Sequence, residues 1–447
     1  MDKQLLAISP IDGRYYEKTM ELASFFSEYA LIKYRIVVEI KYFIFLYNLG
    51  LKELSELTED DIKNINSIHE NFDIEEAEVV KEFEGRTNHD VKAVEYYIKF
   101  IMATFDLEKY SRFVHFGLTS QDINNTSLSL IVKDFIQYYN AKSFIIIEKL
   151  DNFRKLYRDI PMLSRTHGQP ASPTLLGKEF AVFYERLYNQ LIGLNNTLIT
   201  TKFGGAVGNL NAHYVSYPNY NWAEEMDIFI HNLGMMRQQN TTQIEHYDNL
   251  AAIFDGFKRV NVILVDMCRD IWHYISLGYF TQKFKKGEVG SSTMPHKINP
   301  IDFENAEGNL LLANALFEFL SRKLPISRLQ RDLTDSTVTR NIGVACSHTI
   351  IGFKSILRGL DKIVVNRTKI NEDLEDNWVV ISEAIQTILK REGINDGYEL
   401  LKDFTRNNSK IGKEEIHKFI DELKVSDEVK EDLKTITPYN YTGYSHY

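Results

Sequence analysis

The sequence predicts an all-α protein built on long bundle helices. Nine prolines interrupt 447 residues and leave very long proline-free stretches, which only helices use comfortably at such length. Along these stretches apolar residues recur at steps of three and four, which is the spacing of one helix face. Alternating runs bounded by Asn-Gly or Asp-Gly, the pattern of strands and hairpins, are essentially missing.

This spacing predicts three long helices. The first covers about 25–47, the second about 176–198 and the third about 251–280. Pro173 stands just before the second and is a helix-start signal. The apolar positions of the three helices are Phe25, Tyr29, Ile32, Ile36, Ile40, Phe43 and Tyr47, then Leu176, Phe180, Phe183, Leu187, Leu191, Leu194 and Leu198, then Phe257, Val260, Leu264, Met267, Ile271 and Ile275.

Length and composition divide the chain into three helical domains. A chain of 447 residues exceeds one ordinary domain. Residues 1–110 are polar and charge-rich outside one long helix, 111–360 hold the longest apolar-periodic segments, and 361–447 return to short charged helices. Helices with such wide apolar faces usually bury them against partner helices, so we expect an oligomer. The alternative is burial within one large monomeric bundle.

The composition indicates a soluble cytoplasmic protein. Hydrophobic residues make up 44% and charged residues 26%, without a membrane-length apolar run or a secretory signal. The formal charge of −10 argues against bulk binding of nucleic acid. Cys268 and Cys346 lie in apolar-patterned stretches, and we expect buried reduced thiols there instead of a disulfide or a nucleophile. Neither a nucleic acid nor a membrane is therefore expected as a partner.

A polar loop interrupts the long helices at residues 287–300, which read GEVGSSTMPHKINP. Its two glycines and two prolines are helix breakers. Ser291, Ser292, Thr293, Lys297 and Asn299 offer three hydroxyls, an ammonium and an amide within nine residues, which suits a carboxylate or a phosphate. From composition alone, a polar turn with a serine as helix cap is an equal alternative.

A second polar stretch, SRTHGQPA at 164–171, comes just before the helix expected after Pro173. It contains His167, and histidine is the side-chain type suited to proton transfer at neutral pH, while Gly168 permits the close approach of another backbone. A histidine before a helix is also a common hydrogen-bonding partner in a turn, so a catalytic and a structural role both stay open.

Three further stretches group side chains that suit an anionic substrate. They read TNHDV at 87–91, TSQD at 119–122, and RLQRD at 328–332 followed by STVTR at 336–340. The first pairs His89 with Asp90, the second places hydroxyls at a helix start, and the third offers Arg331 and Arg340 for a phosphate. Helix capping is the structural alternative for the first two, and a solvated charged helix face for the third.

No metal or cofactor is expected. The chain has no His-Glu-x-x-His, no Cys-x-x-Cys and no Gly-x-x-x-x-Gly-Lys-Ser/Thr motif. Residues 204–209 read GGAVGN and do not complete a dinucleotide fingerprint. The chemistry that remains is proton transfer and charge stabilisation by serine, histidine, lysine and arginine.

These stretches together resemble a known family. GSSTMPHKINP at 290–300 is similar to the signature loop of the fumarase/aspartase superfamily. THGQPA at 166–171, TNHDV at 87–91 and TSQDINN at 119–125 narrow the resemblance to the adenylosuccinate lyase family. SPIDGRY at 9–15 and the Arg331 segment point to the longer bacterial form of that family. The resemblance runs in order from Ser9 to about Pro438.

The resemblance implies three helical domains whose long central helices form the bundle of a homotetramer, with each active site drawing on three subunits. It implies a β-elimination that releases fumarate from adenylosuccinate, giving AMP, and from succinylaminoimidazole carboxamide ribotide in purine biosynthesis. Two alternatives remain. One is another fumarate-releasing lyase of the superfamily, and the other is a non-catalytic helical scaffold.

The resemblance also assigns roles to residues. Ser291 is implied to remove a carbon proton and His167 to protonate the departing nitrogen. A serine hydroxyl is almost never ionised at neutral pH, so backbone amides and Lys297 must stabilise its alkoxide; whether Ser291 or Ser292 is the base stays open. The implied substrate-binding residues are Thr119, Ser120, Ser292, Lys297 and Asn299 at the carboxylates, Arg14, Tyr15, Arg331, Ser336 and Arg340 at the phosphate, His89 nearby with its neighbours Asn88 and Asp90, and Gln243 and Asn305 at the succinyl or base portion.

Overall fold

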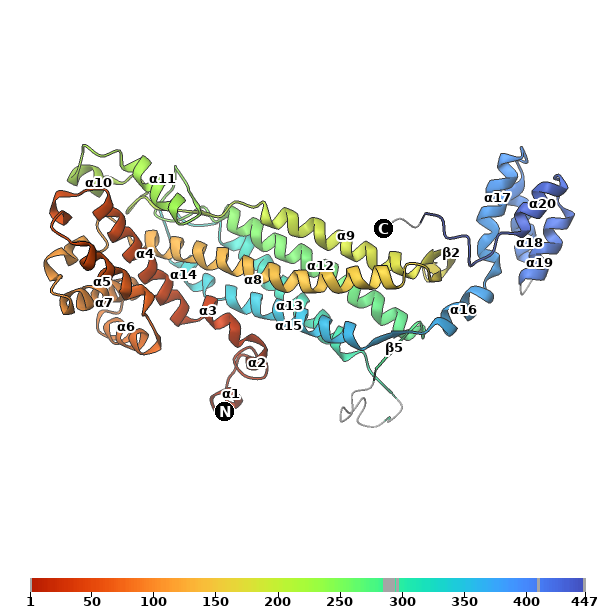
Figure 1. The fold of residues 1–447 in the computed structure, drawn as a ribbon, viewed down its shortest axis with the longest axis horizontal. Helices are drawn as coiled ribbons and strands as arrows, with labels where there is room; N and C mark the ends of the chain where they lie inside the picture. Colours follow the sequence, from red (N-terminus) through yellow and green to blue (C-terminus); the bar gives the residue numbers. More distant parts are fainter. Residues whose placement is uncertain (1, 284–293, 295–296, 408–410, 445–447) are drawn as a thin grey trace. The chain divides into compact units, whose positions relative to one another are not determined.

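The computed structural model describes residues 2–283, 294, 297–407 and 411–444, and these are mainly helical (Figure 1). The chain forms two compact units. The first contains Met1–Ser143, Gln190–Val262 and Gly308–Lys354, and the second contains Phe144–Asn189, Ile263–Glu307 and Ser355–Tyr447. The division into three domains at 1–110, 111–360 and 361–447 stays a prediction.

Five long helices each contribute residues to both units. They are α8 (Ser120–Leu156), α9 (Leu176–Asn195), α12 (Asp248–Ser276), α13 (Ile301–Lys323) and α15 (Ile342–Lys362). Within the first unit, the buried Asn261 of α12 donates to Asn314 Oδ1 of α13 at 3.1 Å and to Thr349 Oγ1 of α15 at 3.0 Å. A Cβ at Gly256 would lie 2.8 Å from Leu194 of α9. The helices of the bundle are therefore closely packed around Gly256 and Asn261 of α12.

The N-terminal part of the first unit is a helical cluster around α4 (Glu28–Asn48). Ser27 caps α4 by accepting the Ala30 N–H at 3.0 Å. The apolar face of α4 packs against α5 (Glu59–Glu70), α6 (Ile74–Thr87) and α7 (Asp90–Thr104). Shorter elements of this unit are α1 (Asp2–Leu5), α2 (Tyr16–Thr19), α3 (Ala23–Phe26), α10 (Asn211–Ser216), α11 (Trp222–Asn232), α14 (Thr334–Thr339), and the parallel pair β3 (Thr200–Thr201) and β4 (Met236–Arg237).

The second unit adds two small antiparallel sheets and a C-terminal helical cluster. β1 (Pro161–Thr166) pairs with β2 (Gln169–Leu175), and β5 (Phe280–Gln282) pairs with β6 (Ile363–Val365). The C-terminal helices pack around a separate apolar core that includes Trp378, Ile385 and Ile420. They are α16 (Arg367–Glu375), α17 (Ser382–Arg391), α18 (Gly397–Asn407), α19 (Lys413–Glu422) and α20 (Asp427–Lys434).

The predicted fold class is confirmed, with one correction. The three periodic stretches form α4, α9 and α12. The expectation that hairpins are missing is wrong at 161–175, where β1 and β2 form one. Pro170 and Pro173 lie inside β2, and prolines argue against a strand when the sequence is read alone. At the turn, His167 and Gly168 have φ of 54° and 75°, the left-handed pair that a two-residue type I′ hairpin needs.

The composition also predicted the state of the two cysteines. Cys268 and Cys346 are both free and buried, and burial raises the pKa of each thiol well above its usual value. These thiols are therefore neutral and poor nucleophiles. In the described ranges, no helix combines the length and the apolarity needed to cross a membrane.

Candidate active site

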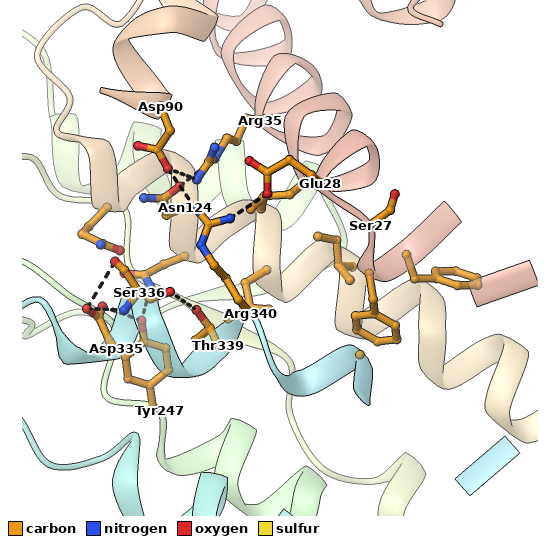
Figure 2. A pocket seen from close by; sticks show the side chains of 18 residues that line it. Ser27, Glu28, Arg35, Asp90, Asn124, Tyr247, Asp335, Ser336, Thr339 and Arg340 are labelled. Atoms are coloured by element: carbon orange, nitrogen blue, oxygen red, sulfur yellow. Dashed lines mark hydrogen bonds and ion pairs between the residues drawn. The ribbon is translucent and has the colours of Figure 1, made fainter. Parts of the chain in front are cut away.

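A cavity of about 300 Å³ lies in the first unit, lined by the start of α4, the first turns of α8, and α14 (Figure 2). Of the residues predicted from sequence, Asp90, Ser336 and Arg340 line it. The other polar side chains in its wall are Ser27, Glu28, Arg35, Gln121, Asn124, Asn125, Tyr247, Asp335 and Thr339.

Two arginines from different elements share the acidic groups of this cavity. Arg35, in the middle of α4, donates to Asp90 Oδ2 at 2.6 Å and to Asn124 Oδ1 at 2.8 Å. Burial opposes ionisation of Asp90, but the Arg35 guanidinium prevails and holds the pKa of that carboxyl below its usual value. Arg340 donates to Glu28 Oε2 at 2.6 Å and lies 3.6 Å from Asp90 Oδ2 (Figure 2).

A third guanidinium, that of Arg331 just before α14, contacts residues that line the same cavity. Arg331 donates to Ser336 Oγ at 2.9 Å and lies 3.5 Å from Asp335 Oδ1. The amide oxygen of Gln121, assigned from the hydrogen bonds around it, accepts from Arg331 at 2.5 Å. Two guanidinium groups and a hydroxyl therefore gather around one helix, and such a set suits a phosphate dianion.

The start of α8 presents two predicted substrate-binding hydroxyls. α8 begins at Ser120, and the backbone N–H of Thr119 donates to Asp122 Oδ2 at 2.7 Å. This is half of a capping box, as the TSQD pattern suggested. In the part of the chain that the structure describes, the hydroxyls of Thr119 and Ser120 have no hydrogen-bond partner. Their backbone is thus fixed while their side chains stay available to a ligand.

His213 lies beneath the turn that leads into α8. Its side chain is fully buried, and a Cβ at Gly117 would lie 2.6 Å from its ring. Nε2 is 2.7 Å from Tyr42 Oη, while Nδ1 has no partner among the described residues. Burial lowers the pKa of His213 to about 4, because the imidazolium would lose its hydration.

This histidine predicts a pH dependence of stability. Between the ordinary pKa of 6.5 and the folded-state pKa of about 4, the unfolded chain binds a proton that the folded chain does not. Stability is therefore present above pH 6.5 and is lost as the pH falls through this window. When the pH falls from about 7.5 to about 5, we expect the contribution of His213 to reduce the free energy of unfolding by about 1–2 kcal/mol.

The check is to compare chemical denaturation of the wild type and His213→Leu at both pH values. The variant should show a smaller loss of stability on acidification, since Tyr42 Oη keeps its bond to the Phe116 carbonyl at 3.1 Å. His231→Leu, which changes an exposed histidine of α11, is the matched control and should keep the wild-type dependence. Equal pH dependence in all three proteins would contradict the prediction.

The remaining predicted residues of the first unit occupy varied positions. Arg14 is exposed and Tyr15 half-buried, just before α2, and Asn88 is exposed with φ of 51°. His89 caps α7 by accepting the Lys92 N–H at 3.2 Å, so its structural role as a cap is real. Gln243 donates to the Ala206 carbonyl at 3.0 Å and, through its backbone N–H, to the Gln330 carbonyl at 3.2 Å.

Six predicted residues fall within the ranges of the second unit, and four of them are among the described residues. His167 is exposed at the tip of the β1–β2 hairpin. Lys297 is exposed and Asn299 half-buried before α13, and Asn305 of α13 accepts the Ser355 hydroxyl at 2.8 Å. Ser291 and Ser292 lie outside the described residues, as does most of the polar loop at 287–300.

Several cavity residues were missed when the sequence was read alone. Glu28 follows a helix cap and is an ordinary first-turn acid in the sequence. Arg35 did carry a signal, because it interrupts the apolar face between Ile32 and Ile36. Gln121 lies within the TSQD motif at 119–122, but the motif did not indicate a role for it. Among the described residues, no group of His, Cys, Asp or Glu side chains is placed to hold a metal ion.

Comparison with known proteins identifies the family. The chain matches the family model Lyase over residues 13–314 and the model Adenylosuccinate lyase C-terminal over residues 327–442. An adenylosuccinate lyase of Dictyostelium discoideum is 56% identical over 451 residues, which covers 98% of this chain and 97% of that protein. This chain belongs to the adenylosuccinate lyase family. An adenylosuccinate lyase of Escherichia coli (strain K12) is 45% identical over 446 residues, and this alignment covers 98% of this chain and 97% of that protein.

Solved structures show the same fold at low identity. A fumarate lyase from Mesorhizobium sp. BNC1 has a TM-score of 0.73 at 18% identity and covers 96% of this chain and 95% of its own. A β-carboxy-cis,cis-muconate cycloisomerase from Acinetobacter calcoaceticus sp. ADP1 has a TM-score of 0.72 at 16% identity, with 95% of each chain covered. As a member of the adenylosuccinate lyase family, the chain is a carbon–nitrogen lyase with a small-molecule substrate.

Proposed function

We propose that this protein releases fumarate from adenylosuccinate to give AMP, and from succinylaminoimidazole carboxamide ribotide, in the cytoplasmic synthesis of purine nucleotides. The observation that carries the proposal is the nearly full-length likeness to adenylosuccinate lyases. The gathering of Arg331, Ser336 and Arg340 around one short helix supports it, because both substrates carry a phosphate.

In the proposed reaction, one proton moves from carbon to nitrogen. The alkoxide of Ser291 takes a proton from the carbon next to a carboxylate. The electron pair of that C–H bond forms the double bond of fumarate while the C–N bond breaks, and protonated His167 gives its proton to the departing nitrogen. Lys297 and backbone amides would stabilise the alkoxide, without which a serine is too weak a base.

The other predicted residues would hold the two ends of the substrate. The hydroxyls of Thr119 and Ser120, together with Ser292, Lys297 and Asn299, would bind the carboxylates that gain charge as the proton leaves. The phosphate would lie against Arg14, Tyr15, Arg331, Ser336 and Arg340, near His89 with Asn88 and Asp90. Gln243 and Asn305 would contact the succinyl or base portion.

A rival function is that of a sister lyase acting on argininosuccinate or aspartate. Neither of those substrates carries a phosphate, so neither would use the two arginines at α14. Fumarate release from equal concentrations of adenylosuccinate, argininosuccinate and aspartate separates the candidates. We expect adenylosuccinate alone to be cleaved, and faster release from either of the others would overturn the proposal.

We further propose a homotetramer in which each active site draws on three subunits. Supporting this, large apolar side chains are exposed along the long helices of the single chain, among them Trp272 on α12 and Leu312 and Phe319 on α13. Such faces normally pack against a partner. The proposed acid and base would come from different subunits.

Shared sites predict rescue between inactive variants. His167→Ala and Ser291→Ala are each expected to be inactive alone. After mixing and subunit exchange, some sites of the hybrid tetramers would combine an intact His167 with an intact Ser291, so partial activity should return. Mass spectrometry would confirm the exchange, and each variant mixed with itself is the control. No rescue in exchanged tetramers would contradict shared sites.

A further inference from the structure

A fully buried ion pair lies directly behind the start of α8. Lys202 Nζ is 2.6 Å from Asp122 Oδ1, and neither side chain is exposed to solvent. Lys202 also donates to the Gly205 carbonyl. Removing two charges from water is costly, so such a pair is weak evidence for stability alone and is best attested where it fixes a particular geometry.

The partners of Asp122 show which geometry this pair fixes. Besides Lys202, its carboxylate accepts the N–H of Thr119 at 2.7 Å, of Gly204 at 2.8 Å and of Gly205 at 3.1 Å. One carboxylate therefore joins the residue before α8 to the loop 204–208, more than eighty positions later in the chain.

The loop 204–208 has little freedom to move from this position. Gly205 has φ of 77°, and a Cβ there would lie 3.2 Å from the Gly117 carbonyl. Gly208 has φ of 82°, and a Cβ there would lie 2.3 Å from the Thr241 carbonyl. Glycine is thus needed at both positions for conformation and for space. The GGAVGN stretch, which is not a dinucleotide fingerprint, has a packing role between two segments of the chain.

The far side of this loop holds another proposed substrate-binding residue. The Ala206 carbonyl accepts from the side-chain amide of Gln243 at 3.0 Å. The loop is thereby fastened to Thr119 through Asp122 on one side and to Gln243 on the other. The hydroxyls of Thr119 and Ser120 remain available to a ligand, as described above.

We propose that Lys202 and Asp122 are positioning residues, whose buried ion pair sets the loop 204–208 so that Thr119, Ser120 and Gln243 meet the carboxylate-bearing part of one substrate. The inference rests on the proposed function, because that function supplies the ligand of these three residues. Neither Lys202 nor Asp122 touches the substrate. Their effect on the reaction passes through the groups that they hold in place.

The test uses Lys202→Met in the full-length enzyme, which keeps the length of the side chain and removes its charge. We expect the KM for adenylosuccinate and the inhibition constant of fumarate to rise about tenfold, which is the scale of a misplaced hydrogen-bonding group. The inhibition constant of inorganic phosphate should change less than about twofold, because Arg331 and Arg340 have their own partners. A purely structural role would lower the active fraction, and hence the apparent kcat, but would leave KM unchanged.

A second variant keeps the inference testable if Lys202→Met alone folds poorly. Lys202→Met combined with Asp122→Asn removes the unpaired buried charge and leaves an oxygen for the glycine N–H groups, but offers no second acceptor to Thr119. We expect its melting temperature to recover toward that of the wild type, while KM and the fumarate inhibition constant stay raised. An insoluble double variant would contradict the inference.

Lys99→Met is the matched control, since it removes a lysine whose Nζ is 2.6 Å from the buried Glu95. It should cost stability and leave KM unchanged. Wild-type values of KM and of the fumarate inhibition constant in a folded Lys202→Met or double variant would overturn this inference but not the proposed function. A wild-type enzyme that releases no fumarate from adenylosuccinate would overturn the proposed function, and this inference with it.

Discussion

We expect that replacing Ser291 or His167 by alanine will lower the turnover of adenylosuccinate at least ~100-fold, which is the scale expected for the loss of a general acid or base. The reason is that each group carries one half of the proposed proton transfer. Without Ser291 nothing accepts the carbon proton, and without His167 the nitrogen must leave as an anion. Steady-state kinetics on each purified variant measure the effect, and circular dichroism checks the fold.

Ser292→Ala is the matched control for the base. It removes a hydroxyl one position away, which is proposed to bind a carboxylate and not to take the proton. Its main effect should be on KM, with kcat changed far less than in Ser291→Ala. If Ser292→Ala loses turnover while Ser291→Ala keeps it, the base has been assigned to the wrong serine. Near-wild-type turnover in both Ser291→Ala and His167→Ala would refute the mechanism.

The second large effect is expected at Arg340, which we assign to the substrate phosphate. Charge-assisted hydrogen bonds contribute about 1.5–3 kcal/mol each, so Arg340→Met should raise KM for adenylosuccinate about 10- to 100-fold. Arg340→Lys keeps the charge but loses the planar pair of donors, and should recover part of the affinity. Inhibition by inorganic phosphate should weaken in parallel with substrate binding.

Arg328→Met is the control for this effect. Arg328 precedes the same helix, its side chain is 79% exposed, and it lies 3.0 Å from Asp332. Exposed pairs of this kind contribute little to stability, so the variant should keep the wild-type KM. An unchanged KM in Arg340→Met, or an equal rise in Arg328→Met, would contradict the phosphate assignment.

The sequence was most informative where one physical rule acts alone. Helical spacing predicted α4, α9 and α12 because a buried helix face must be apolar whatever its neighbours are. The sequence did not predict the hairpin at His167, because its strands contain prolines. Its turn also depends on two left-handed residues, of which only Gly168 favours that conformation.

The same difference between local and long-range contacts decides which site residues the sequence could predict. TSQD predicted a helix start at Ser120, because capping is local and leaves a local pattern. Lys202 gave no signal of its burial, since a lysine beside glycines normally belongs to a solvated loop and its partner Asp122 is distant in sequence. The contacts of Glu28 and Arg340 are likewise long-range. No local periodicity encodes a pairing of that kind.

The most direct measurement of the central claim is the product balance of the purified wild-type enzyme with adenylosuccinate. Fumarate can be followed spectrophotometrically, and AMP can be quantified by chromatography in the same samples. We predict one fumarate and one AMP for each adenylosuccinate consumed, with both products absent in His167→Ala. Consumption without equal amounts of the two products, or no consumption by the folded wild-type protein, would contradict the account.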